Sequence, residues 1–276
     1  MRLRALLPLA ATASLLLSAC DGERATAPLA PTSPSFITDG SVDGGGHPAV
    51  ILIIMDVAGA PAFRCSGTLL TPTFVVTAGH CTGEPGEFSG MRVFTESDVQ
   101  NGDNNYPFAG PNTIEAKAWY THPQFTEATF SLHDVGVIQL SSPVTLPAGA
   151  SYGQLPALNQ LDALKPSSHT TFTAVGYGLQ LSGPKKFVAQ KIRMVAEPHL
   201  LQINTGFTGD FSLLLSNNAN TGGTCFGDSG GPNFVGSSNV LGGVTSFGLN
   251  GSCGGTGGVF RLDRKNVLDF VTKYMK

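Results

Sequence analysis

Short, mainly apolar runs alternate with clusters of glycine, proline, asparagine and serine over most of this 276-residue chain. The run at residues 49–55 contains no polar side chain and fits a strand that is buried on both faces. Further runs of strand length follow at 68–70, 74–78, 135–140, 171–175, 191–195, 211–215 and 240–246. Runs of this size with frequent turn signals, and without alternating helical segments, predict an all-β sandwich or barrel.

Composition supports a folded protein and excludes one class of partner. Hydrophobic residues make up 41% of the chain, which is too many for a disordered protein. The formal net charge is −3, and only 13% of the residues are charged. A protein that binds nucleic acid by charge needs a basic face, so nucleic acid is excluded as a partner.

The last segment has the pattern of a helix rather than of a strand. Val267, Val271 and Tyr274 recur at helical spacing, and Asp263 stands where it could cap a helix that follows it. We therefore expect a short C-terminal helix at about 264–275 that packs on the β structure.

The first residues predict export. Arg2 and Arg4 precede an apolar stretch at 5–17, which is shorter than the roughly 20 residues of a membrane-spanning helix. A charged start followed by an apolar middle is typical of a secretory signal peptide, which we assign to 1–19. The proline-rich residues 20–36 predict an extended tether or a pro-segment.

The end of the signal, residues 17–20, reads Leu-Ser-Ala-Cys and resembles a bacterial lipobox. In that motif the signal is cut before the cysteine and the cysteine is lipidated, so Cys20 is a candidate lipidation site. Ordinary cleavage further on, near Ala27 or Ala30, would instead discard Cys20. The two alternatives predict an envelope lipoprotein or a secreted protein, with membrane contact only through a lipid on Cys20.

Lipidation or later cleavage takes Cys20 out of the pool of thiols, and four cysteines then remain: Cys65, Cys81, Cys225 and Cys253. An even number in an exported protein predicts two disulfides, but four cysteines allow three pairings and their spacing does not choose among them. No C-x-x-C or H-E-x-x-H spacing occurs, so we expect no metal site.

Residues 225–232 read Cys-Phe-Gly-Asp-Ser-Gly-Gly-Pro and are the most informative stretch of the chain. A serine among glycines fits a tight turn that exposes its hydroxyl, and the N–H groups of Gly227 and Ser229 could converge on one point. Such convergence would hold the negative oxygen of a tetrahedral intermediate. A plain glycine-rich loop is the alternative interpretation of this segment.

A nucleophilic Ser229 would need a base, and the base would need an orienting carboxylate. His80 stands out among the histidines because it follows an apolar strand within Thr-Ala-Gly-His-Cys, residues 77–81. Asp134 opens the run 134–140, where burying a carboxylate is costly unless it is hydrogen-bonded. Taken singly, each of these residues could have a purely structural role.

Together, the segments TAGHC, DVGVIQL and CFGDSGGP, in this order, resemble those of the trypsin/chymotrypsin-like serine peptidases. His80 and Asp134 lie 54 residues apart, and Asp134 and Ser229 lie 95 residues apart, which suits two successive barrels. The order His, Asp, Ser differs from the order in subtilisins and in α/β-hydrolases. The resemblance extends over about residues 37–276, which we expect to form the peptidase domain.

The fold that this resemblance implies is all-β, with two six-stranded Greek-key β-barrels packed together. The first barrel is expected at about 45–150 and the second at about 160–262, with the short helix after them.

The chemistry that the resemblance implies is that of a serine endopeptidase without a cofactor. His80 would take the proton of Ser229 as it attacks a peptide carbonyl, and Asp134 would orient the imidazole. The amides of Gly227 and Ser229 would hold the oxyanion, and water would release the acyl-enzyme. Proteins or peptides are the implied substrates, and we expect a monomer.

The resemblance also implies a disulfide pairing and a substrate pocket. Cys65 would pair with Cys81, and Cys225 with Cys253. The residues assigned to the pocket are Gly223, Ser246, Phe247, Gly248 and Gly258.

The resemblance implies a role for the residues assigned to the pocket. Gly223 stands at the base position, where a trypsin-type enzyme has Asp, so no strict preference for Lys or Arg is expected. Gly248 and Gly258 would leave the pocket open, and Phe247 replaces the family's usual Trp. Ser246 would help to hold Asp134. We expect a neutral pocket that prefers apolar or aromatic side chains.

The sequence leaves the activation step open, and it leaves two alternative functions. In many relatives a newly cut N-terminal amine pairs with the aspartate before the catalytic serine, here Asp228. Ile37 is the candidate new N-terminus, although the usual Ile-Val-Gly-Gly is not intact. A catalytically silent binding module on the same fold is one alternative, and an esterase-like hydrolase with the same acyl chemistry is another.

Overall fold

The computed structural model describes residues 37–129, 131–183, 186–204 and 209–275. The predicted signal peptide at 1–19, the tether at 20–36 and the candidate lipidation site Cys20 lie outside these residues. Of the helices in the described ranges, none has the length and apolar character needed to cross a bilayer.

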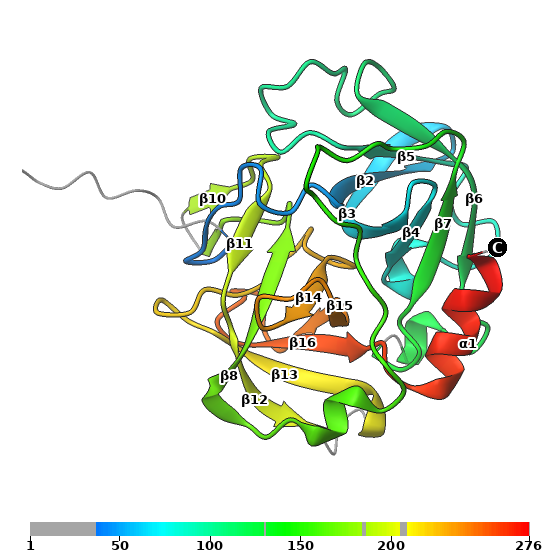
Figure 1. Cartoon of the computed structure of the whole chain (residues 1–276). Helices are drawn as coiled ribbons and strands as arrows, with labels where there is room; N and C mark the ends of the chain where they lie inside the picture. Colours follow the sequence, from blue (N-terminus) through cyan, green and yellow to red (C-terminus); the bar gives the residue numbers. More distant parts are fainter. Residues whose placement is uncertain (1–36, 130, 184–185, 205–208, 276) are drawn as a thin grey trace, which may run out of the picture. The chain divides into compact units, whose positions relative to one another are not determined.

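The first half of the described chain forms a closed barrel of antiparallel strands (Figure 1). Its strands, in chain order, are β2 (Val50–Val57), β3 (Ala60–Thr71), β4 (Phe74–Thr77), β5 (Gly90–Phe94), β6 (Thr113–Thr121) and β7 (Gly136–Leu140). They pair in the order β2-β3-β4-β7-β6-β5, and β5 closes the barrel against β2. β2 is buried from Val50 to Asp56, as the apolar run at 49–55 predicts.

The second half forms another closed barrel. Its strands are β8 (Ser167–Gly176), β12 (His199–Ile203), β13 (Ser212–Asn217), β14 (Pro232–Val235), β15 (Leu241–Gly248) and β16 (Gly255–Arg261). They pair in the order β8-β12-β13-β16-β15-β14, and β14 pairs with β8 to close the ring.

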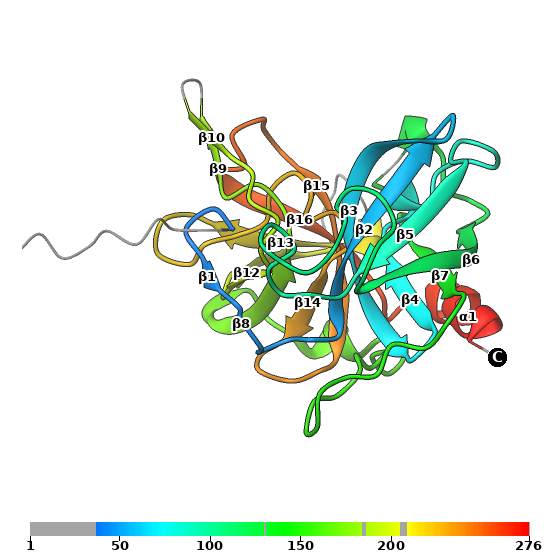
Figure 2. The ribbon, with the colours of Figure 1, turned by 90° about the horizontal axis from the view of Figure 1, so that it is seen from above.

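Short elements complete the described fold. The strands β11 (Met194–Ala196) and β1 (Ser41–Val42) extend the second sheet beside β8. The strands β9 (Leu181–Gly183) and β10 (Lys186–Val188) pair only with each other, as a hairpin (Figure 2). The connections contain the 3-10 helices η1 (Gly79–Cys81), η2 (Glu127–Thr129), η3 (Gln160–Ala163) and η4 (Gly209–Phe211).

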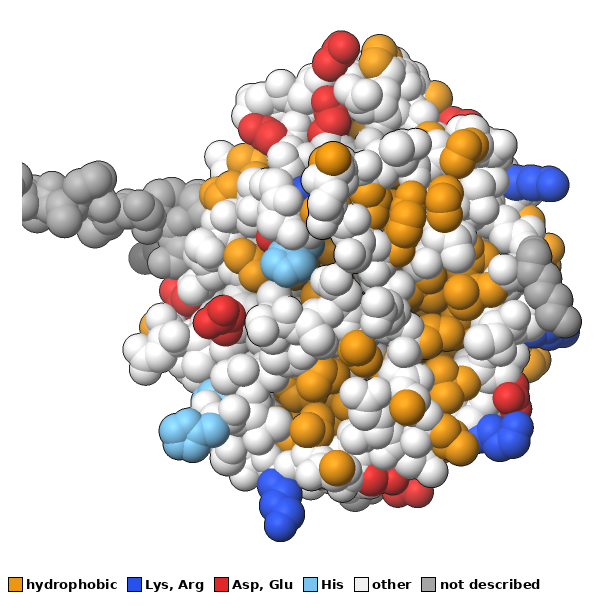
Figure 3. All heavy atoms as spheres, viewed as in Figure 1, with side chains coloured by type: hydrophobic (Ala, Val, Ile, Leu, Met, Phe, Trp, Pro, Cys, Tyr) orange, Lys and Arg blue, Asp and Glu red, His pale blue; other side chains and the backbone are white. Residues whose placement is uncertain are grey.

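One hydrophobic core holds the two barrels together. The main cluster of buried apolar residues fills the first barrel and continues into the second, where Val175, Phe234 and Phe260 belong to it. A smaller cluster around Phe172 and Leu213 fills the rest of the second barrel. On the face in Figure 3, hydrophobic side chains gather in a band across the middle while charged side chains lie mostly toward the margin.

The prediction of two closed six-stranded β-barrels with a short C-terminal helix is confirmed. Several strands were not predicted, because they lack the continuous apolar run from which strands were expected. β6 alternates polar and apolar residues, β14 begins with a proline and β16 is rich in glycine. The strand expected at 191–195 is wrong in its first half, since β11 begins at Met194 and Ile192 makes only an isolated bridge to Asp98.

The C-terminal helix α1 spans Lys265–Tyr274 and packs against the first barrel, although it follows the last strand of the second (Figure 1). Its buried residues are Val267, Phe270 and Val271. Tyr274 stacks on Tyr120 of β6, with 4.1 Å between the ring centroids. The helix therefore fastens the end of the chain to the barrel that carries His80 and Asp134.

The predicted helix cap at Asp263 is wrong. Arg264 occupies the N-cap position, without a side-chain capping bond. The Asp263 carboxylate instead accepts two hydrogen bonds from Arg261 and one from the backbone N–H of Leu161. Arg261 is fully buried, and a buried guanidinium needs a carboxylate more than an exposed helix end does.

Candidate active site

Two neighbouring strands of the first barrel bring His80 and Asp134 together. His80 lies in η1 after β4, and Asp134 lies just before β7, which pairs with β4. The His80 Nδ1 atom is 3.1 Å from Oδ1 and 3.0 Å from Oδ2 of Asp134. The backbone N–H of His80 also donates to Oδ1, over 2.9 Å. The imidazole is thus held at one edge, with Nε2 on the far side of the ring.

The second barrel contributes another donor to Asp134. Ser246 of β15 donates a hydrogen bond from Oγ to Oδ2 of Asp134 over 2.5 Å. Asp134 is fully buried, and these partners offset the cost of removing a carboxylate from water. Gly79 permits this close approach, because a Cβ there would lie 3.1 Å from the backbone nitrogen of Val135.

Two opposing effects act on the pKa of His80. Burial by itself lowers this pKa, but the charge and the hydrogen bond of Asp134 raise it, and the charges of Glu127 and Glu87 add to the rise. The net result is a pKa above the ordinary value of 6.5. Only above that pKa is the imidazole mainly in the neutral form that can accept a proton.

Ser229 lies on a tight turn that follows Cys225. Gly227 and Gly230, on either side of it, have φ values of 96° and 77°, which a side chain would strain. The backbone N–H of Asp228 closes the turn by donating to the Cys225 carbonyl over 3.0 Å. Among the described residues, nothing accepts a hydrogen bond from the N–H of Gly227 or of Ser229. Both amides are therefore available to an external oxygen.

The buried aspartate beside Ser229 stabilises this turn. Oδ1 of Asp228 accepts from the backbone N–H of Gly178 over 2.8 Å, and Oδ2 accepts from that of Cys225 over 2.9 Å. Burial raises the pKa of Asp228 to about 6, against the opposing effect of these two bonds and of the Arg64 charge. Asp228 thus links the Ser229 turn to the end of β8.

The first barrel also holds the turn, through Ser66 of β3. The backbone N–H of Ser66 donates to the carbonyl of Ser229 over 2.8 Å, and its Oγ donates to the carbonyl of Gly227 over 3.0 Å. A Cβ at Gly230 would overlap Oγ1 of Thr77, so only glycine fits where the Ser229 turn meets β4 of the first barrel. Sequence analysis missed Ser66, and its place beside Cys65 is the only local signal for it.

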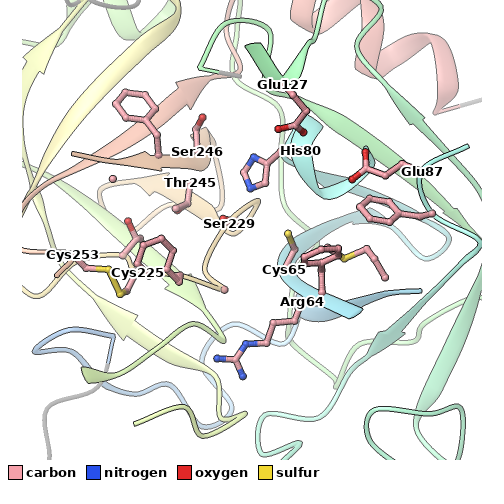
Figure 4. A pocket seen from close by; sticks show the side chains of 18 of the residues that line it. Arg64, Cys65, His80, Glu87, Glu127, Cys225, Ser229, Thr245, Ser246 and Cys253 are labelled. Carbon is pink, nitrogen blue, oxygen red and sulfur yellow. A yellow bond between two sulfur atoms is a disulfide. The ribbon is translucent and has the colours of Figure 1, made fainter. Parts of the chain in front are cut away.

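A cleft of about 640 Å³ lies between the barrels, and both His80 and Ser229 line it (Figure 4). Figure 4 shows the His80 ring over Ser229, although the two residues come from different barrels. The charged side chains that line the cleft all come from the first barrel, and they are Arg64, Glu87 and Glu127. The structure therefore brings a histidine, a carboxylate, a serine and two unused amides to one accessible site.

The predicted pocket residues divide into two groups. Those that line the cleft are Ser246, Phe247 and Gly248. Gly223 and Gly258 are not among its lining residues. The Phe247 ring covers Gly258, where a Cβ would overlap it, and a Cβ at Gly223 would overlap the Asn217 side chain. Two lining residues that sequence analysis did not identify are Thr224 and Asn250.

Both predicted disulfides are confirmed, as Cys65–Cys81 and Cys225–Cys253. The first joins β3 to η1 directly beside His80, and the second borders the cleft on the side of the second barrel. The potential ligand atoms of Cys65, His80 and Cys81 lie within 4.8 Å of one another. Since both sulfurs belong to a disulfide, this cluster offers no pair of thiolates to a metal.

Comparison with known proteins agrees with this geometry. The Trypsin family model matches residues 45–269. The chain is 28% identical to Trypsin iota of Drosophila melanogaster over 189 residues, which are 67% of this chain and 68% of that protein. It is 29% identical to Brachyurin of Leptuca pugilator over 198 residues, which are 69% of this chain and 78% of that protein.

A solved structure of HL collagenase matches the fold, with a TM-score of 0.65 and 20% sequence identity. The match covers 85% of this chain and 96% of that chain. The range of the family model contains both barrels and all three of His80, Asp134 and Ser229. The chain therefore belongs to the trypsin-like serine protease family.

Proposed function

We propose that this protein is a serine endopeptidase that hydrolyses peptide bonds through an acyl-enzyme intermediate. The observation that carries the proposal is the meeting of His80 and Ser229 in one cleft, with Asp134 bonded to the far edge of the His80 ring. Membership of the trypsin-like serine protease family supports protein substrates.

The first half of the reaction forms the acyl-enzyme. His80 removes the proton from Ser229 Oγ as this oxygen attacks the carbonyl carbon of the peptide bond. Asp134 keeps the imidazole in the tautomer whose Nε2 can accept that proton, and its charge stabilises the imidazolium. The amides of Gly227 and Ser229 donate to the carbonyl oxygen as it becomes negative. His80 then gives the proton to the leaving amine, and the peptide bond breaks.

The second half repeats these steps with water. His80 removes a proton from the water that attacks the ester carbonyl, and the same two amides hold the new oxyanion. The ester bond to Ser229 Oγ then breaks, and His80 returns the proton to this oxygen. These steps use the side chains of the triad, the two backbone amides and water, and they regenerate the enzyme.

The primary specificity pocket is proposed to be neutral and to accept apolar or aromatic side chains. The described cleft-lining residues of the second barrel carry no charge, and Phe247 and the Cys225–Cys253 disulfide supply apolar surface there. The family resemblance puts Gly223 where a trypsin-type enzyme has Asp, although Gly223 is not among the residues that line the described cleft. Peptides varied only at the residue before the cleaved bond test this, and a clear preference for Arg would overturn it.

Labelling with a fluorophosphonate probe tests the catalytic assignment. Wild-type protein should be labelled, while Ser229→Ala and His80→Ala should lose labelling by about a hundredfold or more. Ser151→Ala, at an exposed serine, is the matched control and should label like the wild type. A folded wild-type protein that is not labelled would support the catalytically silent module instead.

Turnover of paired substrates separates the peptidase from the esterase-like alternative. The proposal expects cleavage of a peptide amide as well as of a simple ester with the same acyl group. Turnover of the ester alone, with the Ser229→Ala variant inactive, would favour the esterase-like hydrolase.

We also propose that the chain is exported and acts as a monomer, anchored through a lipid on Cys20. The lipobox-like residues 17–20 support the anchor, and two disulfides suit an oxidising compartment. Full-length protein produced in a bacterium with labelled palmitate should carry the label in the membrane fraction, and Cys20→Ser should not. A labelled Cys20→Ser variant, or an unlabelled wild type, would contradict the anchor.

A further inference from the structure

We propose that Arg64 selects substrates with an acidic side chain on the leaving-group side of the cleaved bond. This inference rests on the endopeptidase function proposed above and adds a substrate class to it. Arg64 belongs to β3, directly before Cys65, and it lines the same cleft as His80 and Ser229.

The guanidinium of Arg64 lies beside the candidate oxyanion hole. A Cβ built on Gly227 would be 3.0 Å from Nε and 3.6 Å from Cζ of Arg64, so the side chain passes directly over this glycine. Figure 4 shows Arg64 on the opposite side of Ser229 from Ser246. A substrate held at Ser229 would therefore have one of its two chain directions near Arg64.

The edge of β15 indicates which direction that is. β14 pairs with β15 only as far as Val244, and Ser246, Phe247 and Gly248 beyond it line the cleft. An extended acyl segment of the substrate can lie along this part of β15, as in the addition of a strand to a sheet edge. The leaving segment then runs away from β15, toward Arg64.

The N–H groups of the Arg64 guanidinium are available to a ligand. It is half-buried, and its guanidinium makes no hydrogen bond or ion pair with any residue that the structure describes. Guanidinium presents five N–H donors in a planar fork that matches a carboxylate. The buried Asp228 attracts this charge, but both Asp228 oxygens already accept backbone N–H groups. A carboxylate from outside is thus the complementary ligand.

The distribution of charge around the cleft also favours a carboxylate as the ligand of Arg64. Lys191 does not line the cleft, but it lies near enough for the Arg64 charge to add to burial in lowering the pKa of Lys191. The acidic residues Glu87 and Glu127 instead lie by His80, where both raise the pKa of that imidazole. The cleft therefore has a cationic end and an acidic end, and the cationic end is the one at Arg64.

Pairs of peptides that differ only by Glu or Gln test the inference. The exchange is made at the first, second or third residue after the cleaved bond, and kcat/KM is measured for each pair. For the wild type we expect Glu to be preferred by about three- to tenfold at one of these positions. Arg64→Met should bring that ratio close to one, and Arg64→Glu should invert it.

A matched control and a salt series complete the experiment. Lys117→Met removes an exposed charge from the same barrel and should keep the wild-type ratio. The wild-type ratio should also shrink as salt is raised from about 0.02 M to about 0.5 M, because screening weakens an accessible ion pair. This measurement needs no variant, so it does not depend on the folding of Arg64→Met.

Two results would overturn the inference. They are a wild-type ratio near one at all three positions, and an unchanged ratio in Arg64→Met. An unchanged ratio with an equal loss of kcat/KM for both peptides would mean that Arg64 only balances the Asp228 charge. Failure of the endopeptidase function itself would look different, since no peptide would be cleaved and no probe would label Ser229.

Discussion

At the scale of single side chains, Asp134 is the member of the candidate triad that both barrels hold in place. It has no contact with solvent, and its partners come from both barrels, His80 from the first and Ser246 from the second. Ser246 does not touch the reacting atoms in the proposed mechanism. It is a positioning residue, which acts through Asp134.

Replacing Ser246 separates positioning from binding. We expect Ser246→Ala to lower kcat about five- to tenfold with little change in KM, since a carboxylate with one bond fewer holds the imidazole less firmly. Asp134→Asn should lower kcat by about 10⁴, because the amide favours the wrong tautomer of His80. Steady-state kinetics with a peptide substrate measure both, with Ser151→Ala as control. An unchanged kcat in Ser246→Ala would contradict the positioning role.

Gly230 provides a second test at this scale. Gly230→Ala combines a φ of 77° with overlap of the new Cβ on Thr77 Oγ1. Gly149 has a φ of 85° but nothing within 4 Å of its Cβ position, so Gly149→Ala carries the backbone strain alone. We expect Gly230→Ala to lower the free energy of unfolding by about 3 kcal/mol or more and to abolish probe labelling of Ser229. Gly149→Ala should lower it by only about 1 kcal/mol. Equal losses for the two variants in urea unfolding would contradict this prediction, because they would show that the structure relaxes to remove the overlap at Gly230.

Among the elements, α1 and the segment before β7 form one packed unit behind the candidate site. The rings of His122 and His133 stack at 5.0 Å between centroids, and Phe270 of α1 packs edge-on against His122 at 5.1 Å. The backbone N–H of His122 donates to the carbonyl of Val135, next to Asp134. The stacked histidines thus lie between the helix and the backbone that carries Asp134.

This unit predicts a loss of stability in mild acid. Burial first, and the neighbouring His133 second, lower the pKa of His122 to about 4. Because this value is below the ordinary 6.5, the unfolded chain takes up the proton first. The stability that is linked to the neutral form of His122 is therefore fully present above about pH 6.5, and it is lost as the pH falls toward about 4.

Urea unfolding at about pH 7 and about pH 4.5 measures this effect. We expect His122→Phe, which keeps an aromatic ring in the stack, to remove about 1–2 kcal/mol of the acid-induced loss. His169→Phe, at an exposed histidine, should leave the loss unchanged. The same acid-induced loss in His122→Phe as in the wild type would exclude His122 as its source.

For the whole molecule, the two-barrel arrangement sets the electrostatic environment of the cleft. Charges on the loops of the first barrel lie by His80 and act on it, while the second barrel contributes uncharged lining. The pH dependence of activity therefore reports on residues beyond the triad.

The acid limb of the activity profile should reflect this environment. The raised pKa of His80 means that the imidazole stays protonated to a higher pH, so the midpoint of kcat/KM should lie above about 6.5. Glu127→Gln should move this midpoint down by about 0.2–0.5 pH unit, and Glu87→Gln should act in the same direction. Glu115→Gln, an exposed change on β6, is the control. A wild-type midpoint at or below 6.5 would contradict the raised pKa of His80.

The sequence by itself determined the all-β class, the C-terminal helix and the presence of two disulfides, because apolar runs, helical spacing and the number of cysteines can be read along the chain. Short motifs identified the family, and the resemblance to that family supplied the disulfide pairing, which cysteine spacing leaves open. The sequence also named His80, Asp134 and Ser229 as candidates. Only the tertiary structure decided that Phe247 covers Gly258, that Asp263 serves Arg261 and not the helix end, and that Ser66 and Arg64 lie against Gly227. These outcomes depend on contacts between distant segments, where packing and the cost of burying charge act, and no local pattern encodes them.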